Sequence, residues 1–544
     1  MQYKEISRIL GKYLLYFTLI LCIPFCVALY YHYIDDSSHP HAALEFLETI
    51  FICFCLSLFF QFLGRNAKGN LYRRESILLV VIIWLLTAFI SAMPFYFTKN
   101  LSPLDSYFEA MSGLTTTGAS MMSPKAYNSE KKEQPIYLTN IHVPEKTYTY
   151  YGTIKPLKDP NTNKIVSTGV EAVSHSLMFW RSFIQWLGGM GIVVLFLAIL
   201  PSLAVGGKYL YQTEIPGPTK DSITPRIKDT ASLLWKFYLL LTVLEIFLLI
   251  WTNPEMQLLD AFCITFSTLS TGGFSLKNNS IGAYNNPYTE WIVIIFMILG
   301  SINFAFYFHI IRKKFNKIYE PDFLLFIIII IVGSLLIAFN IYGHEYFLSD
   351  GTKSTYDLTT AIREGSFQSI SAQTSTGFFT QNYDLWPFAA QTVMLVLMFI
   401  GGMAGSTCGG IKTSRFYILY KIVIHRIESI FRPDVVRRLV VGKNEIEEKT
   451  ALTVLAFFCI VIFFTVIATI IFVFDGLDPT CSIGTVTCMI NNIGMAFNAT
   501  GPDGTFNILS PLSKVISIIL MLVGRLEFFA ILILLVPGFW KSNK

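Results

Sequence analysis

Long apolar segments alternate with polar segments along the whole chain. A helix that crosses a lipid bilayer needs about 20 predominantly apolar residues. Ten stretches approach or exceed that length and predict spanning helices, near residues 13–33, 44–63, 76–98, 178–201, 231–252, 289–310, 322–342, 387–424, 450–474 and 513–537. Glycines interrupt the eighth stretch, 387–424. The pattern therefore predicts an all-α polytopic membrane protein.

Four shorter, half-polar stretches lie between these segments. They fall near residues 104–117, 258–271, 358–376 and 479–493, and each is too short to span a bilayer. We expect each to be a re-entrant half-helix whose C-terminal, partly negative end points toward a common axis. Residues typical of helix starts are Asp105, Asp260, Asp357 and Asp478.

The four short stretches resemble one another when they are aligned on a glycine. The aligned segments begin at Phe108 (FEAMSGLTTTGAS), Phe262 (FCITFSTLSTGGFS), Phe367 (FQSISAQTSTGF) and Gly484 (GTVTCMINNIGMA). The key glycines in this alignment are Gly118, Gly272, Gly377 and Gly494. Each repeat therefore consists of a spanning helix, a half-helix, a glycine-containing strand and a second spanning helix.

This repeat divides the chain into five parts. We expect two extra N-terminal helices in 1–70, followed by pore repeats in 71–205, 206–311, 312–430 and 431–544. The first pore repeat carries a polar insertion, 122–177, for which we expect β-hairpin or irregular structure.

Non-helical backbone at membrane depth persists only inside protein or around water. Four such strands around one axis would form a ring of carbonyl oxygens that replaces the hydration shell of a cation. Small residues also serve ordinary helix packing, but four copies at matched positions favour a filter. The predicted filter residues are Thr116, Thr117, Gly118, Ser270, Thr271, Gly272, Ser375, Thr376, Gly377, Asn492, Ile493 and Gly494, and we expect a metal ion at these positions only.

The interrupted eighth segment predicts a gate. Each glycine inside a helix costs about 1 kcal/mol relative to alanine, so a dense run of glycines breaks the helix and can place a polar loop in the pore. The alternative is a helix contact surface made of small residues. The predicted gate residues are Gly401, Gly402, Gly405, Ser406, Thr407, Gly409, Gly410, Lys412 and Arg525.

Charged residues inside apolar segments usually face a partner or water. We expect Arg525 to face the pore below the filter, near the gate loop; the alternative is an ion pair with Glu527 or Glu245. Arg181 is expected to brace a pore helix. Glu245 is either a proton site or a core acid with satisfied hydrogen bonds.

Lysine and arginine gather in alternate connecting segments, which places both termini in the cytoplasm. One basic loop on that side contains Arg65, Lys68, Arg73 and Arg74. The others, 206–230, 312–321 and 425–449, are candidate docking sites for a regulator, although the positive-inside bias alone explains their charge. Seven lysines lie in the insertion on the opposite side, and long loops translocate largely regardless of charge.

Composition and motifs exclude other classes. Only 14% of residues are charged and 53% are hydrophobic, while a net charge of +5 without aromatic-basic interleaving argues against nucleic acid. The nine cysteines are expected to be buried apolar residues. No catalytic motif appears, so we expect neither an enzyme nor a cofactor bound by this chain. A secondary transporter with inverted repeats is a further alternative, but the four repeats share one order and topology.

Seven motifs together resemble the Trk/Ktr/HKT superfamily of potassium transporters, and most closely its bacterial TrkH branch. They are TTTGA (115–119), STGGFS (270–275), TSTGF (374–378), NNIG (491–494), FWRSFIQWLGGMGI (179–192), GGMAGSTCGGIKTSRF (401–416) and GRLEFF (524–529).

The resemblance implies a pseudo-fourfold pore in each chain and potassium as the transported ion. It also implies an intramembrane gate loop, a homodimer and a cytoplasmic TrkA-like ring that binds the regulatory nucleotide. In plant relatives, a serine at the first filter position is associated with sodium preference, so Gly118 favours potassium. Such a protein is expected in the bacterial cytoplasmic (inner) membrane, either as a channel or as a proton- or sodium-coupled symporter.

Overall fold

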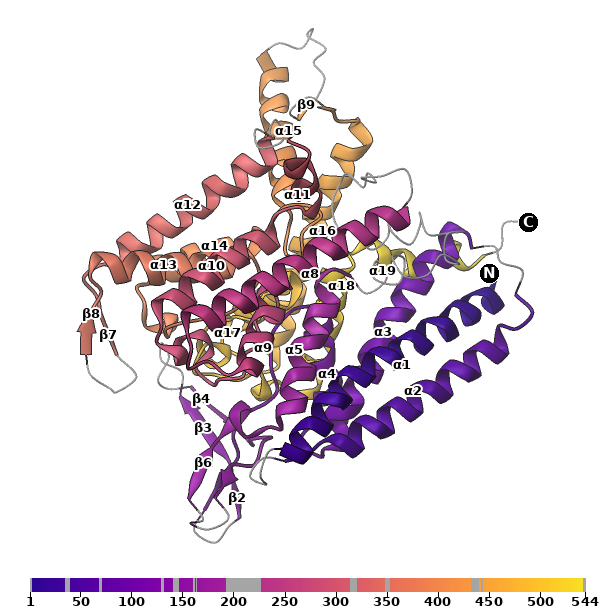
Figure 1. The fold of residues 1–544 in the computed structure, drawn as a ribbon. Helices are drawn as coiled ribbons and strands as arrows, with labels where there is room; N and C mark the ends of the chain where they lie inside the picture. Colours follow the sequence, from indigo (N-terminus) through magenta and orange to yellow (C-terminus); the bar gives the residue numbers. More distant parts are fainter. Residues whose placement is uncertain are drawn as a thin grey trace.

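The computed structural model describes most of the chain, in the following ranges: 2–34, 40–67, 71–128, 132–139, 146–159, 162, 164–191, 227–313, 320–347, 353–431, 440–441 and 444–541. Two long helices, α1 (Tyr3–Ile34) and α2 (Ala43–Leu63), pair at one side of a helical bundle (Figure 1). Both helices pack against the Trp180 ring of the bundle. Its centroid lies 6.4 Å from that of Phe17 on α1 and 6.2 Å from that of Phe46 on α2.

The elements of the first two repeats follow in the predicted order. They are α3 (Arg73–Phe97), α4 (Pro103–Leu114) and α5 (His175–Gly189), and then α8 (Ile227–Thr252), α9 (Leu258–Leu269), α10 (Pro287–Ser301) and α11 (Phe304–Ile311). Short helices therefore occupy the first two half-polar stretches.

The last two repeats have the same order. They comprise α12 (Pro321–Ile341), α13 (Leu358–Gln373), α14 (Phe388–Phe399) and α15 (Thr413–Phe431), and then α16 (Glu448–Phe474), α17 (Pro479–Asn491), α18 (Pro511–Arg525), α19 (Phe529–Leu535) and α20 (Pro537–Trp540). The chain is predominantly helical, which confirms the predicted fold class.

Two of the expected spans are sharply bent. Among the described residues, six helices are long and apolar enough to cross a membrane unbroken: α1, α2, α3, α8, α12 and α16. The expected span 289–310 turns by 91° between α10 and α11, and the expected span 513–537 turns by 117° between α18 and α19. Hydropathy reports the environment of side chains, not the direction of the axis, so it cannot reveal these turns. Most of 178–201 beyond α5 lies outside the described residues.

The insertion forms antiparallel hairpins, as predicted. Its strands pair as β1 (Ala126–Tyr127) with β2 (Glu133–Gln134), β3 (Ile136–Thr139) with β4 (Thr147–Tyr150), and β5 (Leu157–Lys158) with β6 (Ile165–Ser167). These hairpins project from the bundle at the lower edge of Figure 1, and α15 extends from the upper edge. Two smaller hairpins are β7 (Glu345–Phe347) with β8 (Lys353–Thr355) and β9 (Val440–Val441) with β10 (Asn444–Glu445).

Both ends of the described chain lie at the same end of the bundle. Arg8, near the start of α1, donates a 3.4 Å hydrogen bond to the carbonyl of Ala67, which follows α2. Arg74, at the start of α3, donates a 3.0 Å hydrogen bond to the carbonyl of Lys541. An even number of crossings therefore separates the two ends.

The cysteines do not all follow the expectation of burial. Cys53, Cys263, Cys408, Cys481 and Cys488 are buried, but Cys26, Cys55 and Cys459 are exposed on α1, α2 and α16. A cysteine on the outer face of a spanning helix is surrounded by lipid, so it meets an apolar environment without being buried in protein.

Candidate ion pathway

Each pore helix begins at a polar cap, but two of the four predicted caps are displaced. Asp357 and Asp478 are the N-caps of α13 and α17 and accept hydrogen bonds from backbone amides three residues on. At α4 the cap is Ser102, whose hydroxyl accepts from the amide of Asp105. At α9 the capping position is held by Gln257, and Asp260 lies in the first turn. Acidic side chains in a first turn still favour the helix dipole.

The four segments that leave the pore helices share one backbone conformation. In each, a non-glycine residue with left-handed φ is followed two positions later by a glycine with positive φ. The pairs are Thr116 (56°) and Gly118 (84°), Thr271 (54°) and Gly273 (73°), Ser375 (54°) and Gly377 (85°), and Asn492 (54°) and Gly494 (87°). These four segments are called the filter strands.

This conformation corrects the alignment of the second repeat. The predicted key glycine was Gly272, because Phe262 lies ten residues before it, but the glycine with positive φ is Gly273. Hydrogen bonds that close each helix end agree, since the amides of Thr117, Gly272, Thr376 and Ile493 all donate to a carbonyl five residues back, at 2.8 to 3.0 Å. The equivalent residues of the second strand are therefore Thr271, Gly272 and Gly273, and Ser270 corresponds to Thr115.

The glycines of the filter strands pack in a closed ring. A Cβ atom placed on Gly118 would come within 3.0 Å of the Gly272 carbonyl oxygen. A Cβ atom on Gly273 would likewise meet the carbonyl oxygen of Thr376, and one on Gly377 would meet that of Ile493. A Cβ atom on Gly494 would meet the carbonyl oxygen of Thr117, in the first strand. Each repeat thus contacts the next, and the fourth contacts the first. A side chain at any of the four glycines would collide with a neighbouring backbone carbonyl.

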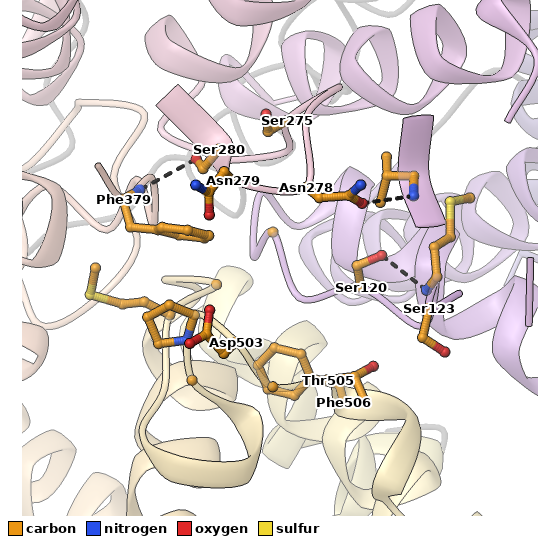
Figure 2. A pocket seen from close by; sticks show the side chains of 18 of the residues that line it. Ser120, Ser123, Ser275, Asn278, Asn279, Ser280, Phe379, Asp503, Thr505 and Phe506 are labelled. Atoms are coloured by element: carbon orange, nitrogen blue, oxygen red, sulfur yellow. Dashed lines mark hydrogen bonds between the residues drawn. The ribbon is translucent and has the colours of Figure 1, made fainter. Parts of the chain in front are cut away.

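The ring lies at the base of an outer cavity. A cavity of about 460 Å³ is lined by Gly118, Gly273, Gly377 and Gly494. Tyr150, at the end of β4 in the insertion, forms part of its wall. Figure 2 shows polar side chains around this space, including Ser120, Ser275 and Asp503. A volume of this size holds several water molecules, so an ion can remain hydrated until it reaches the glycines.

Buried polar groups brace the strands from behind. As predicted, Arg181 braces a pore helix: its Nε lies 2.6 Å from Oε1 of Glu109 on α4. Arg181 also donates to the carbonyl of Ser275 at 2.9 Å. Gln185 was not predicted; its amide donates to the carbonyl of Gly272 at 2.6 Å and accepts from the amide of Phe274 at 3.1 Å. The available signal was its position on α5, one helical turn from Arg181 and one from Gly189.

The eighth apolar segment is broken, as the glycine run predicted. Residues 400–412 form a loop between α14 and α15 that is closed at its base by a 2.9 Å hydrogen bond from the amide of Gly401 to the carbonyl of Ile411. Gly405 and Gly410 adopt positive φ at 78° and 68°, which a helix cannot accommodate. This segment is called the gate loop.

The gate loop lies directly beneath the filter strands. The Thr407 hydroxyl is 3.4 Å from that of Thr271, and the amide of Gly409 donates to the hydroxyl of Ser375 at 2.7 Å. A Cβ atom on Gly409 would come within 3.0 Å of the carbonyl oxygen of Asn491. The loop therefore contacts the second and third filter strands and the end of α17, from which the fourth strand continues.

Arg525 lies where it was predicted, below the filter and against the gate loop. It donates to the Thr407 carbonyl at 2.7 Å and to the Thr116 hydroxyl at 3.2 Å. Two further hydrogen bonds reach the carbonyls of Gly188 and Gly189 at 2.7 and 2.6 Å. The predicted alternative partner, Glu527, forms an ion pair with Arg415 at 2.7 Å.

Lys412 and Cys408 hold the lower part of the gate loop. Lys412 is buried and its ammonium donates a hydrogen bond to the carbonyl of Cys408. The Cys408 sulfur lies 2.9 Å from the Ser301 hydroxyl, at the bend between α10 and α11. The amide of Met403 donates to the Ser301 carbonyl at 3.0 Å. The bent helix of the second repeat thus supports the loop of the third.

Comparison with known proteins agrees with this architecture. The family model described as "TrkH: Cation transport protein" matches residues 160–541. The chain is 31% identical over 552 residues to the Trk system potassium uptake protein TrkH of Escherichia coli K12, with all of both chains covered. It is 30% identical over 549 residues to the Trk system potassium uptake protein TrkH of Vibrio parahaemolyticus, again with all of both chains covered.

A solved structure has the same fold. The crystal structure of the potassium transporter TrkH from Vibrio parahaemolyticus aligns with a TM-score of 0.78 and 28% sequence identity, over 99% of this chain and 100% of that chain. Sequence and structure therefore agree over the full length, and the chain belongs to the TrkH family of cation transport proteins.

Proposed function

We propose that this chain takes up potassium ions through a channel-like pore that ends at the gate loop. The curated relatives are named as potassium uptake proteins of a Trk system. The observation that carries the proposal is the closed ring in which Gly118, Gly273, Gly377 and Gly494 each meet a carbonyl of the next repeat.

Backbone carbonyls are the groups that replace the water around a dehydrating potassium ion. The carbonyls that we propose as ligands belong to Thr116, Thr117, Gly118, Thr271, Gly272, Gly273, Ser375, Thr376, Gly377, Asn492, Ile493 and Gly494. Several stacked sites allow successive ions to displace one another. An inside-negative potential contributes about 2.3 kcal/mol per charge per 100 mV to inward movement.

The gate loop and Arg525 hold the pathway closed. The loop fills the space beneath the strands, and the guanidinium adds a positive charge at the same level. A cation that leaves the filter would meet both a steric block and an electrostatic barrier. Opening requires the loop to move away from Thr271, Ser375 and Arg525.

A partner subunit would supply that movement. We propose a homodimer in the bacterial inner membrane, with both termini in the cytoplasm, above a TrkA-like nucleotide-binding ring. The end of the bundle that carries α15 would face the ring, because α15 follows the gate loop directly. The name "Trk system", which the relatives carry, is consistent with further subunits. The basic segment 206–230 lies mostly outside the described residues.

Rubidium-86 uptake into proteoliposomes tests the proposal. Gly118→Ser should reduce uptake or its selectivity over sodium, and deletion of Gly405–Gly409 should make uptake constitutive. Gly476→Ser is the matched control, because Gly476 also has positive φ but has no atom within 4 Å of an added Cβ. Absence of uptake by the wild-type dimer, even with the ring added, would refute the function.

One observation favours a second candidate, a proton-coupled symporter. Glu245 lies on α8 and is fully buried, and among the described residues no lysine or arginine forms an ion pair with its carboxylate. A buried, unpaired carboxylate is costly, so this acid is expected to carry a proton. Glu245→Gln would abolish pH-driven rubidium uptake in a symporter, and it would leave voltage-driven uptake unchanged in a channel.

A further inference from the structure

The outer ends of the third and fourth filter strands meet in the wall of the cavity. The strand of the third repeat leads into the turn η5 (Tyr383–Leu385), and that of the fourth leads into η6 (Asn498–Thr500). The Tyr383 hydroxyl donates to the carbonyl of Ala496 at 2.8 Å. A loop that continues to Asp503 then lines the cavity, where Figure 2 shows its carboxylate.

Two buried side-chain oxygen atoms without a hydrogen-bond partner among the described residues lie at this junction. Asp384 is 1% exposed and Asn498 is 6% exposed, yet Oδ1 of each has no hydrogen-bond partner among the described residues. Buried polar oxygens nearly always have a partner. Two such oxygens on neighbouring turns indicate that something outside the protein chain completes them.

Asn382 connects Asp384 and Asp503, the two acidic residues of this junction. The Asn382 side chain accepts a 3.0 Å hydrogen bond from the amide of Asp384 and donates one to Oδ2 of Asp503. On the other side, Asp384 packs against the fourth repeat so closely that a Cβ atom on Gly501 would come within 3.0 Å of its Oδ2. Asp384, Asn498 and Asp503 therefore border one small region.

The charge at this junction is not balanced. Burial, together with the negative charge of Asp503, raises the pKa of Asp384 to about 7, although the backbone amide of Asn498 opposes the shift. Among the described residues, no lysine or arginine forms an ion pair with either carboxylate. A buried carboxylate without a counter-charge destabilises the folded state unless it is neutralised.

We propose that Asp384, Asn498 and Asp503 form an outer binding site for a hard metal cation that takes oxygen ligands alone. Carboxylate and amide oxygens are preferred by such ions. Asp503 also lines the outer cavity, from which water would complete the shell of a bound ion. The site has two carboxylates and one amide, so it differs from a cluster of three His, Cys, Asp or Glu, of which the described residues contain none. An ion bound there would join the outer ends of filter strands three and four.

Ion-binding stoichiometry tests this site without requiring transport. Rubidium-86, sodium-22 and calcium-45 binding to the purified full-length dimer would be measured for wild type, Asp384→Asn and Asp503→Asn. Asparagine keeps the size of the side chain, so folding should persist. For at least one of the three ions, both variants should bind one ion fewer per chain than wild type. The identity of that ion shows whether the site takes an alkali ion or calcium.

Glu345→Gln is the matched control, because Glu345 is an exposed acid outside this junction that pairs with Lys353. It should bind as many ions as wild type. A second variant, Gly501→Ala, should displace the Asp384 carboxylate and lose the same ion. Equal stoichiometry in all proteins for all three ions would overturn the proposal and leave a protonated Asp384. All of these variants keep the filter strands unchanged. A negative result for the outer site would therefore leave the proposed transport function untouched.

Discussion

The guanidinium of Arg525 donates a 2.7 Å hydrogen bond to the carbonyl oxygen of Thr407, the residue of the gate loop that also reaches the hydroxyl of Thr271. This single contact joins the C-terminal end of α18 to the gate loop. The same guanidinium is held by the carbonyls of Gly188 and Gly189. Repeats one, three and four are thus joined at one charged group.

Replacement of Arg525 by alanine should favour the open state. Hydrogen bonds that involve a charged group each contribute about 1.5–3 kcal/mol, so the loss of the contact with Thr407 should raise rubidium-86 uptake about tenfold or more. The measurement is uptake in the absence of any regulatory subunit. Arg74→Ala, which removes a guanidinium contact far from the pore, should leave uptake unchanged. Equal uptake by Arg525→Ala and wild type would show that the contact does not hold the gate.

The two neighbouring glycines of the second filter strand should respond differently to alanine. Gly273 has φ 73° and an added Cβ would strike the carbonyl of Thr376, whereas at Gly272 it would meet the side chain of Gln185. A left-handed conformation costs an alanine about 1–2 kcal/mol before any clash is counted. Rubidium-86 uptake should therefore fall at least tenfold in Gly273→Ala and less in Gly272→Ala. The reverse order would restore Gly272 as the equivalent of Gly118.

The sequence predicted the helical fold and the glycine strands because each depends on local pattern. Apolar runs identify spans, and the glycine run at 401–410 identifies a break. The register of the second strand was missed because the recurring phenylalanine suggested a spacing, whereas the backbone angles of Thr271 and Gly273 decide the equivalence.

Other features depend on contacts between distant segments and leave little trace in a single sequence. The turn at Ile302 and Asn303 follows Gly300 and Ser301, and Asn303 is the N-cap of α11, but these short signals lie inside a continuous apolar run and do not give the angle of the bend. Glu527 was weighed as a partner of Arg525 because the two are close in sequence, but its carboxylate lies 2.7 Å from Arg415. Helix packing, not sequence separation, determines which charges meet.

The carboxylate of Asp357, the N-cap of α13, should make the stability of the protein depend on pH. Hydrogen bonds from Thr360 and Thr359 lower its pKa from 3.8 to about 2. A lowered pKa means that the stabilisation is complete above pH 3.8 and is lost as pH falls toward 2. Thermal unfolding between pH 5 and pH 2 should therefore show a smaller loss of stability in Asp357→Ala than in wild type. Asp357→Asn should retain the cap at pH 7, and a loss of stability as large in Asp357→Ala as in wild type would contradict this role.

The hydroxyl of Tyr148 should stabilise the attachment of the insertion to the fourth repeat. It donates to Oδ2 of Asp478 at 2.8 Å and accepts from the amide of Asp478 at 2.9 Å. Tyr148→Phe removes both bonds at constant shape, which should cost about 1–3 kcal/mol in the free energy of unfolding. Tyr137→Phe, on the exposed face of the neighbouring strand, is the matched control. Equal melting temperatures for the three proteins would show that the insertion is not anchored here.

The ion pair between Arg415 and Glu527 should couple the gate loop to the bend that carries Arg525. Arg415 lies at the start of α15, and Glu527 lies in the turn between α18 and α19 with φ 54°. The Arg415 side chain is 6% exposed, and its guanidinium also stacks 3.9 Å above the ring of Phe457. Loss of one partner from a buried pair leaves an uncompensated charge and costs about 3–5 kcal/mol.

A double-mutant cycle measures this coupling. Arg415→Met and Glu527→Gln should each lower the melting temperature and raise rubidium-86 uptake, because the loop loses its connection to α18. The double variant should be less destabilised than the sum of the two, since no charge is then left without its partner. Additive effects on both stability and uptake would mean that the two residues act separately. In that case Arg525 alone, through Thr407, would link the C-terminal bend to the gate loop.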